Sequence, residues 1–308
     1  MIIFAAVVGA CALFAGYISF RNYHWARSEI EADPPSPLLK QPESAGIAHV
    51  QAVSFVSRSG LHIAAWYVPS ENRAAVIVAH GTNSDRASML DEIRLLSQAG
   101  FGVLAFDWPG LGESDGRILW GSEARDALSS AIDWICARAD VDPHRVGGLG
   151  FSMGGFMLTQ VAARDRRLRA ITLASAPSDF DSFISLHYTR WGPLSAWPAR
   201  WALRGSDLFA ADHSAVRLIG EISPRPILII AQSDDFEIPM AMTRKLFESA
   251  REPKTLWIIP GNRHGHYAEA AGAEYGRRLQ AFFTDNLLGQ AEPSNPGYSG
   301  DSAKSPAP

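Results

Sequence analysis

The stretch of the sequence best suited to chemistry runs from Gly150 to Gly154 and places Ser152 at its centre. Residues 145–149 before it have the character of a short buried strand, and residues 156–163 after it have that of a helix. A serine between two glycines at such a junction is typical of a nucleophile elbow, a turn so sharp that close neighbours must lack a Cβ atom. The sequence therefore predicts Ser152 as a nucleophile.

An acid and a base are needed as well, because a serine hydroxyl is a poor nucleophile until a base removes its proton and an acid orients that base. Residues 227–231 predict a strand, and the loop after its carboxyl end contains Asp234 and Asp235. We favour Asp235 as the acid because it stands four residues before Pro239, which opens the next helix. Asp234 is the alternative, and either carboxylate could instead cap that helix.

The base is expected in the glycine-rich loop after the following strand, at residues 256–259. This loop contains His264 and His266, and a histidine at the carboxyl end of a strand can reach over Ser152. We favour His264, with His266 as the alternative. The pair could also indicate a metal, but no carboxylate or cysteine at ligand spacing completes a set, so we expect neither a metal nor a cofactor.

Backbone N–H groups that could stabilise an oxyanion are expected beside the serine. Residues 74–79 predict the first parallel strand, and the chain after it can turn back over the elbow. The N–H groups of Thr82 and Met153 would then form an oxyanion hole. We expect His80 to be structural. The glycine-rich loop at residues 107–114 lacks a phosphate-binding spacing and is predicted to border the pocket.

Strands and helices that alternate along the chain position these residues. A hairpin signal at Ser59-Gly60 predicts two antiparallel edge strands, and the later alternation is typical of an α/β fold with a mostly parallel sheet and helices on both faces. Residues 178–212 lack a strand signal, and we expect a small helical cap there that lines an apolar acyl pocket, with ordinary helix packing as the alternative. The predicted strands are residues 50–56, 61–68, 74–79, 102–106, 145–149, 169–174, 227–231 and 256–259.

The chain begins with an uncharged apolar run at residues 2–20, close to the length that spans a bilayer. No Lys or Arg precedes it, which favours a membrane anchor over the alternative of a cleaved signal sequence. Arg21 and Arg27 follow the run and favour a cytoplasmic catalytic domain, with a secreted or periplasmic domain as the alternative. The predicted divisions are an anchor at 1–21, a linker at 22–48, a catalytic domain at 49–288 and a disordered tail at 289–308.

The overall charge excludes one class of partner. The formal net charge is −4, and no basic stripe or basic helix stands out, so we expect no nucleic-acid partner. The two cysteines are Cys11, in the apolar N-terminal run, and Cys136, in a predicted helix. This placement does not indicate a disulfide.

Five segments, HGTNSDR, FDWPGLGESDG, GFSMGG, SDDFEIP and GNRHGH, together resemble the α/β-hydrolase superfamily, most closely its serine aminopeptidase and prolyl-oligopeptidase-like branch. The resemblance covers about residues 49–288, and the doubled aspartate and doubled histidine depart from the pattern of the family. It implies Ser152 as nucleophile, Asp235 as acid, His264 as base, and Thr82 and Met153 as oxyanion donors.

The resemblance implies a serine hydrolase that cleaves carboxylic esters or thioesters through an acyl-enzyme. The aromatic residues of the expected cap and the expected anchor favour a small-molecule ester with a lipid-like acyl group. Three alternatives stay open: a small-peptide or amide hydrolase, an acyltransferase that uses the same residues, and a catalytically silent binding module tethered to the membrane.

Overall fold

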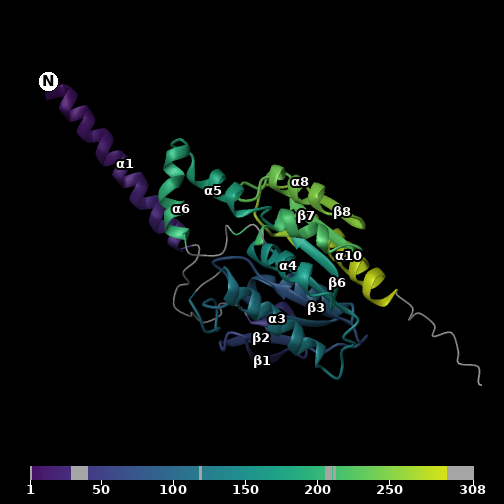
Figure 1. The fold of residues 1–308 in the computed structure, drawn as a ribbon. Coiled ribbons are helices and arrows are strands. Elements are labelled where there is room, and N and C mark those ends of the chain that lie inside the picture. Colours follow the sequence, from purple (N-terminus) through teal and green to yellow (C-terminus); the bar gives the residue numbers. More distant parts are fainter. Residues whose placement is uncertain (1, 29–40, 118–119, 205–209, 211–212, 290–308) are drawn as a thin grey trace, which may run out of the picture.

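The computed structural model describes residues 2–28, 41–117, 120–204, 210 and 213–289. Eight strands form one sheet in the order β1-β2-β4-β3-β5-β6-β7-β8 (Figure 1). The β1–β2 and β2–β4 pairs are antiparallel and all other neighbouring pairs are parallel, which confirms the expected mostly parallel sheet with an edge hairpin. The strands are β1 (Gln51–Val56), β2 (His62–Val68), β3 (Ala75–Ala79), β4 (Gly102–Phe106), β5 (Val146–Phe151), β6 (Leu168–Ala174), β7 (Ile227–Gln232) and β8 (Lys254–Ile259).

Helices cover both faces of the sheet because its central strands are apolar on both sides. Every residue of β3 is buried. Ile77 belongs to one core cluster, whereas Val76 and Val78 belong to the other, since alternate side chains of a strand point to opposite faces. The helices on the first face are α3 (Ser122–Cys136), α4 (Met153–Arg164) and α8 (Met240–Ser249), and those on the second are α2 (Leu90–Gln98) and α10 (Ala273–Phe283).

Two helices and a π-helical turn follow β8. A short helix, α9 (Tyr267–Ala271), is separated from α10 by Gly272, whose φ of 56° lies in the left-handed region that favours glycine. A π-helical turn, η7 (Thr284–Leu288), continues α10. The remaining short helices of the domain are η1 (Pro42–Ala45), η2 (Arg86–Met89), α7 (Ala215–Leu218) and η6 (Ile219–Glu221).

The described residues of the cap segment are helical, and they comprise α5 (Phe180–Tyr188), η3 (Pro193–Ala196) and α6 (Trp197–Leu203). Residues 205–209 and 211–212 of this segment lie outside the described residues. Its three tryptophans do not line an acyl pocket as expected. They are exposed, and two of them contact the N-terminal helix: Trp191 packs against Phe14 and Trp201 against Tyr23. Phe180 and Tyr188 of the cap are buried in the core, and Phe180 packs on Phe156 of the domain.

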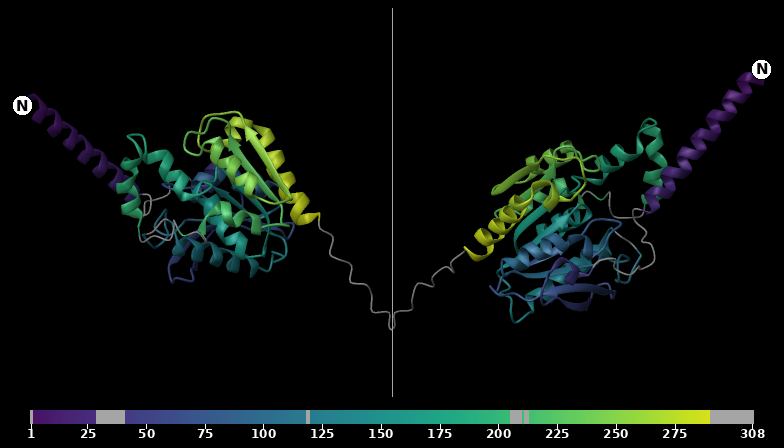
Figure 2. Two further views of the ribbon diagram at one scale, coloured as in Figure 1. Left: turned by 45° about the horizontal axis from the view of Figure 1, so that its top comes forward. Right: turned by 180° about the vertical axis from the view of Figure 1, so that it is seen from behind.

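A single long helix, α1 (Ile2–Ser28), projects from the domain (Figures 1 and 2). By length and composition it could cross a membrane, although a signal sequence passes the same test. It continues beyond its expected end at residue 21 because its last turns pack on the cap. Ile18, Asn22 and Ala26 are buried there, and their spacing of four places them on one helical face. Residues 29–40 of the expected linker and residues 290–308 of the expected tail lie outside the described residues.

Candidate active site

Ser152 stands in the turn between β5 and α4, with φ 52° and ψ −117°. A non-glycine residue at this positive φ costs on the order of 1–3 kcal/mol, and such strain persists only where its surroundings enforce it. The flanking glycines explain how the turn is possible. A Cβ at Gly150 would lie 2.4 Å from the carbonyl oxygen of Gly154, and one at Gly154 would lie 2.2 Å from that of Ala79. The local sequence therefore holds the serine at the carboxyl edge of the sheet.

Two backbone N–H groups beside the serine are available to a ligand. Thr82 follows Gly81, where a Cβ would lie 3.3 Å from the Cβ of Ser152, so the loop after β3 rests on the elbow. Met153 is the first residue of α4, a position whose N–H has no acceptor within the helix. In the part of the chain that the structure describes, neither Thr82 nor Met153 donates a backbone hydrogen bond. This arrangement suits an oxyanion hole.

Asp235 and His264 meet at the same edge of the sheet. His264 Nδ1 lies 2.9 Å from Oδ2 of Asp235, and the carboxylate is buried. The other oxygen, Oδ1, accepts the backbone N–H groups of Glu237 and Ile238 at 2.9 and 3.0 Å. Burial alone would raise the pKa of Asp235, but the hydrogen bond and charge of His264, with the N–H of Ile238, hold it below its ordinary value. The carboxylate is therefore ionised at neutral pH.

The alternative residues of the two loops lie apart from this pair. Asp234 is exposed, and its carboxylate accepts a hydrogen bond from the Ser233 hydroxyl at 2.6 Å. His266 is also exposed, and its Nδ1 lies 3.6 Å from Oε2 of Glu269. The structure therefore brings Asp235 and His264 together and leaves Asp234 and His266 on the surface.

Three further side chains support the pair, and the sequence alone did not single them out. Ser175, directly after β6, donates to Oδ2 of Asp235 at 2.8 Å, and the hydroxyl of Tyr267 donates to Ser175 at 2.6 Å. Gln232, the last residue of β7, clamps the histidine loop: its amide donates to the carbonyl of Gly265 at 2.5 Å and accepts from the N–H of Arg263 at 2.8 Å. Their one sequence signal is that Ser175 and Gln232 mark the carboxyl ends of strands, where sites form in such sheets.

His264 lies beside the serine without bonding it. The centre of its ring lies 4.7 Å from that of Phe151, the residue before Ser152, and the two rings are tilted by 41°. Among the described residues no hydrogen bond joins the Ser152 hydroxyl to the imidazole. Catalytic hydrogen bonds are often long without substrate and tighten when one binds. The second ring nitrogen, Nε2, lies 3.8 Å from Oε2 of Glu237.

His80 is structural, as its loop position predicts. Its Nδ1 lies 2.7 Å from the carbonyl of Gly81, and its Nε2 accepts the N–H of Trp108 at 3.2 Å. An acceptor nitrogen carries no proton, so the ring is neutral with its hydrogen on Nδ1. Burial lowers the pKa of His80 from 6.5 to about 4, in agreement with this form.

This shift predicts an acid-sensitive fold. Between pH 6.5 and 4, His80 is protonated in the unfolded chain but not in the folded chain. The neutral form of His80 therefore contributes its full stabilisation above pH 6.5, and the free energy of unfolding decreases as the pH falls below that value. The expected loss is about 3 kcal/mol over that range. Urea unfolding of the detergent-solubilised chain at several pH values measures it. The His80→Gln variant should lose stability less steeply than the wild type, and equal slopes for the two proteins would contradict the assignment.

The glycine-rich loop after β4 is held rigid by a buried ion pair. Arg86 forms salt bridges with Asp107 and Glu113, and its guanidinium lies 4.7 Å from the ring centre of Trp66. At Gly112, where φ is 54°, a Cβ would lie 2.1 Å from Oδ2 of Asp107. The loop therefore closes around this carboxylate.

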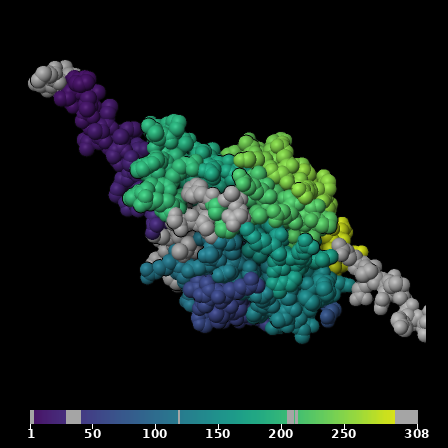
Figure 3. Space-filling view, viewed as in Figure 1, coloured from purple at the N-terminus to yellow at the C-terminus, as the bar shows by residue number. Residues whose placement is uncertain are grey.

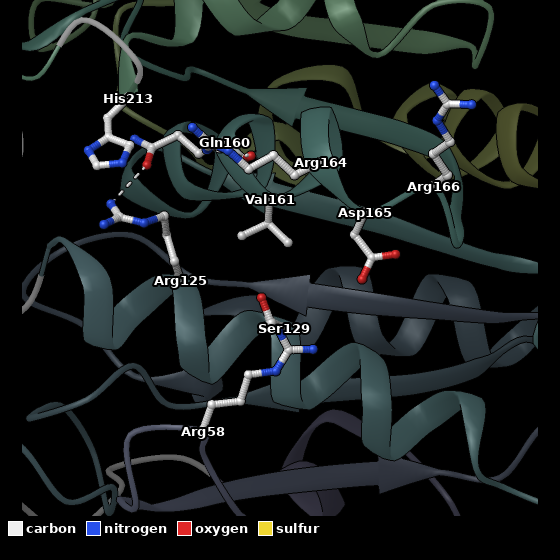
Figure 4. A pocket seen from close by; sticks show the side chains of 9 residues that line it. All are labelled: Arg58, Arg125, Ser129, Gln160, Val161, Arg164, Asp165, Arg166 and His213. Atoms are coloured by element: carbon white, nitrogen blue, oxygen red, sulfur yellow. Dashed lines mark hydrogen bonds between the residues drawn. The ribbon is translucent and has the colours of Figure 1, made fainter.

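A cavity of about 640 Å³ lies between α3 and α4, away from the elbow (Figure 4). Arginines from several elements line it, among them Arg58, Arg125 and Arg166, and Arg125 donates to Gln160 at 3.2 Å. None of the candidate catalytic residues lines this cavity. Arg58 is paired with Asp133 at 2.9 Å, so part of the positive charge there is balanced.

Comparisons with known proteins agree with the fold. A family model described as an alpha/beta hydrolase fold matches residues 74–220. The uncharacterized protein YfhR of Escherichia coli (strain K12) is 29% identical over 256 residues, which cover 80% of this chain and 83% of that protein. The YfhR protein of Salmonella typhimurium is 31% identical over 244 residues, which cover 72% of this chain and 78% of that protein.

The fold is also similar to that of solved structures. The Pyrococcus furiosus esterase Pf2001 superposes with a TM-score of 0.70 over 84% of this chain and 98% of its own, at 18% identity. The hypothetical protein PA2218 from Pseudomonas aeruginosa gives a TM-score of 0.63 at 19% identity, over 83% of this chain and 100% of its own. At these identities the likeness concerns the fold alone. With its sheet order, its elbow and these relatives, the chain belongs to the α/β-hydrolase family.

Proposed function

We propose that this protein is a membrane-anchored serine hydrolase that cleaves carboxylic esters through an acyl-enzyme. The observation that carries the proposal is the hydrogen bond of 2.9 Å between Asp235 and His264 at the edge where the strained Ser152 stands. A buried acid, an oriented imidazole and a serine on an elbow are the components that nucleophilic acyl transfer requires.

The residues would act in the following order. Ser152 Oγ attacks the ester carbonyl carbon while its proton passes to Nε2 of His264. The oxygen of the tetrahedral intermediate accepts the N–H groups of Thr82 and Met153, and one such donor typically contributes about 3–4 kcal/mol. His264 then returns the proton to the leaving alcohol. Water then attacks the carbonyl carbon of the acyl-enzyme, His264 transfers the proton from water to Ser152 Oγ, and the carboxylic acid product is released.

Asp235 sets the tautomer that this order needs. Its carboxylate accepts from Nδ1 of His264, so the unprotonated nitrogen is Nε2. The Asp235→Asn variant should therefore lower kcat by about 10⁴-fold, because the amide can donate to Nδ1 and favour the wrong tautomer. Steady-state kinetics on a soluble ester measures the effect.

The matched control for that prediction is Asp234→Asn in the same loop. Because Asp234 is exposed and does not contact the imidazole, kcat of this variant should stay within a few-fold of the wild type. A large loss at Asp234 with a small one at Asp235 would transfer the role of the acid to Asp234.

Esters are proposed over amides on two grounds. The similar folds include proteins described as esterases, from Pyrococcus furiosus at a TM-score of 0.70 and from Rhodothermus marinus at 0.56. An anchored enzyme also meets acyl esters in the membrane itself.

The anchor is proposed over a cleaved signal because α1 packs on the cap: the buried Asn22 donates to the carbonyl of Ser195 at 2.7 Å, and cleavage would remove this partner.

The experiment is a comparison of p-nitrophenyl esters, from acetate to palmitate, with p-nitroanilides of the same acyl groups. The proposal predicts higher kcat/KM for the esters, with an optimum at one acyl length. Turnover of the anilides alone would indicate an amidase. Formation of a new ester when an alcohol is added would indicate acyl transfer. No turnover at all, together with no labelling by a fluorophosphonate, would favour a binding module.

Carbonate extraction of membranes tests the anchor. The full chain should remain in the membrane pellet, and its release into the supernatant would contradict a transmembrane helix.

A further inference from the structure

The outer end of the cap carries large apolar side chains that are more than half exposed in the described structure. We call this group, Trp191, Leu194 and Trp197, the cap tip. Leu194 is 87% exposed, Trp197 is 65% exposed and Trp191 is 52% exposed. A cluster of exposed large apolar residues on a folded domain marks an interaction surface.

The cap tip is continuous with the apolar surface of α1. The rings of Trp191 and Phe14 meet edge to face with centroids 5.2 Å apart. Figure 1 shows α6 alongside the domain end of α1, and in Figure 3 the cap and α1 form one contiguous surface. Two further contacts fix this arrangement: Asn22 donates to the carbonyl of Ser195, and the ring of Tyr23 packs 5.1 Å from that of Trp201.

The contact with Phe14 gives the depth of the cap tip. Phe14 stands seven residues before Arg21, the first charged residue after the apolar run. At 1.5 Å per residue this corresponds to about 10 Å along the helix axis. The hydrocarbon core of a bilayer is about 30 Å thick. If Arg21 lies at the surface of the core, then Trp191 lies about 10 Å below that surface, well inside one leaflet.

Arginines at the edge of this surface suit the same placement. Arg21 lies over Trp25 and Arg204 over Trp201, with separations of 5.9 and 4.8 Å. Arg190 lies 5.8 Å from Trp191, and at the depth of that ring its guanidinium must extend towards the head groups. Tryptophan and arginine are both favoured where hydrocarbon meets head groups, since long cationic side chains can extend towards water.

We propose that the cap tip is embedded in the leaflet next to the catalytic domain, so that α1 and the cap form one membrane-bound unit. The inference rests on the proposed function, in which α1 is a transmembrane anchor. It also narrows the substrate to an acyl ester that resides in the bilayer. Helix α5 joins the cap tip to the site: near its end, His187 Nε2 lies 3.2 Å from the carbonyl of Glu237, in the loop of Asp235. Helix α5 would therefore be the element that separates a bilayer lipid at the cap tip from the loop of Asp235.

Depth-dependent quenching tests the placement in the full chain. Single cysteines at Leu13, Leu194 and Val56 are introduced into a variant without Cys11 and Cys136 and are labelled with a fluorophore. All three sites are exposed: Leu13 lies on α1, and Val56 is an apolar control on the edge strand β1. In vesicles that contain brominated lipid, the label at Leu194 should lose as large a fraction of its fluorescence as the label at Leu13. The label at Val56 should be unaffected.

The three labels separate the failure of this inference from the failure of the anchor. Quenching at Leu13 without quenching at Leu194 would overturn the embedded cap and leave the anchor intact. If the label at Leu194 were protected from quenching by iodide in water but were not quenched by brominated lipid, a protein partner would cover the cap tip. That result would also overturn the embedded cap. No quenching at either site would overturn the anchor.

A charge at the cap tip provides a functional test. A carboxylate inside a leaflet is unfavourable, so Leu194→Asp should lower turnover of a long-chain ester held in vesicles by on the order of tenfold. Turnover of p-nitrophenyl acetate in water should be the same for Leu194→Asp and the wild type. If the two proteins also hydrolysed the vesicle-bound ester at equal rates, the inference would be overturned. If the wild type hydrolysed neither ester, the proposed function would fail, while the quenching result would still decide the position of the cap.

Discussion

Replacing Ser152 by alanine should lower kcat/KM for a p-nitrophenyl ester by on the order of 10⁵-fold, with the fold intact. The substitution removes the nucleophile but keeps the oxyanion donors, Thr82 and Met153. Stability should change little because the Ser152 hydroxyl forms no hydrogen bond among the described residues, and alanine meets the same strain at φ 52°. Steady-state kinetics gives the loss of activity, and urea unfolding checks the fold.

The control for this variant is Ser233→Ala, which removes a hydroxyl from a neighbouring loop at the same edge of the sheet. That hydroxyl bonds the exposed Asp234, so activity should stay within a few-fold of the wild type. If Ser152→Ala kept about a tenth of the wild-type kcat/KM or more, Ser152 could not be the nucleophile, given the effect expected for one.

Replacing His264 by glutamine should cost a similar factor, on the order of 10⁵ in kcat, because the substitution removes the imidazole that Asp235 orients to take the proton of the serine. The two losses should not add: a variant that lacks both Ser152 and His264 should be no slower than either single variant, since the residues act as one unit. Kinetics of the two single variants and the double variant on one ester measure this.

His266→Gln is the matched control, in the same loop and of the same chemistry. His266 is exposed and lies near Glu269 rather than Asp235, so its loss should change kcat less than about threefold. A large effect at His266 and a small one at His264 would reverse the two roles.

The fold could be predicted in detail because its signals are local. A continuous apolar segment predicted β3, and a Ser-Gly turn predicted the hairpin of β1 and β2. The glycines at 150 and 154 predicted the elbow, because the steric reason for them lies within the turn and the neighbouring strand. The ends of elements were less exact where tertiary contacts decide them. Helix α1 continues past residue 21 because Asn22 finds its partners on the cap, which is distant in sequence.

The loops of the candidate site could be predicted from the sequence, and the spacing to Pro239 favoured Asp235 over its neighbour Asp234. What separates the two aspartates in the structure is tertiary: Asp235 is buried and bonds His264 and Ser175. The supporting contacts of Ser175 and Gln232 cross from one strand end to another, so no local pattern reveals them. The cap tryptophans point outwards for a similar reason. Aromatic composition predicts that such rings are removed from water, but it does not say whether protein or lipid covers them.

Ser152 should react as an activated nucleophile when the folded full chain is treated with a fluorophosphonate and the adduct is mapped by mass spectrometry of the peptides. We expect one adduct, on the peptide that contains Ser152, and none on the Ser152→Ala protein. An adduct on another serine, or no adduct on a wild-type chain that is shown to be folded, would show that Ser152 is not the nucleophile.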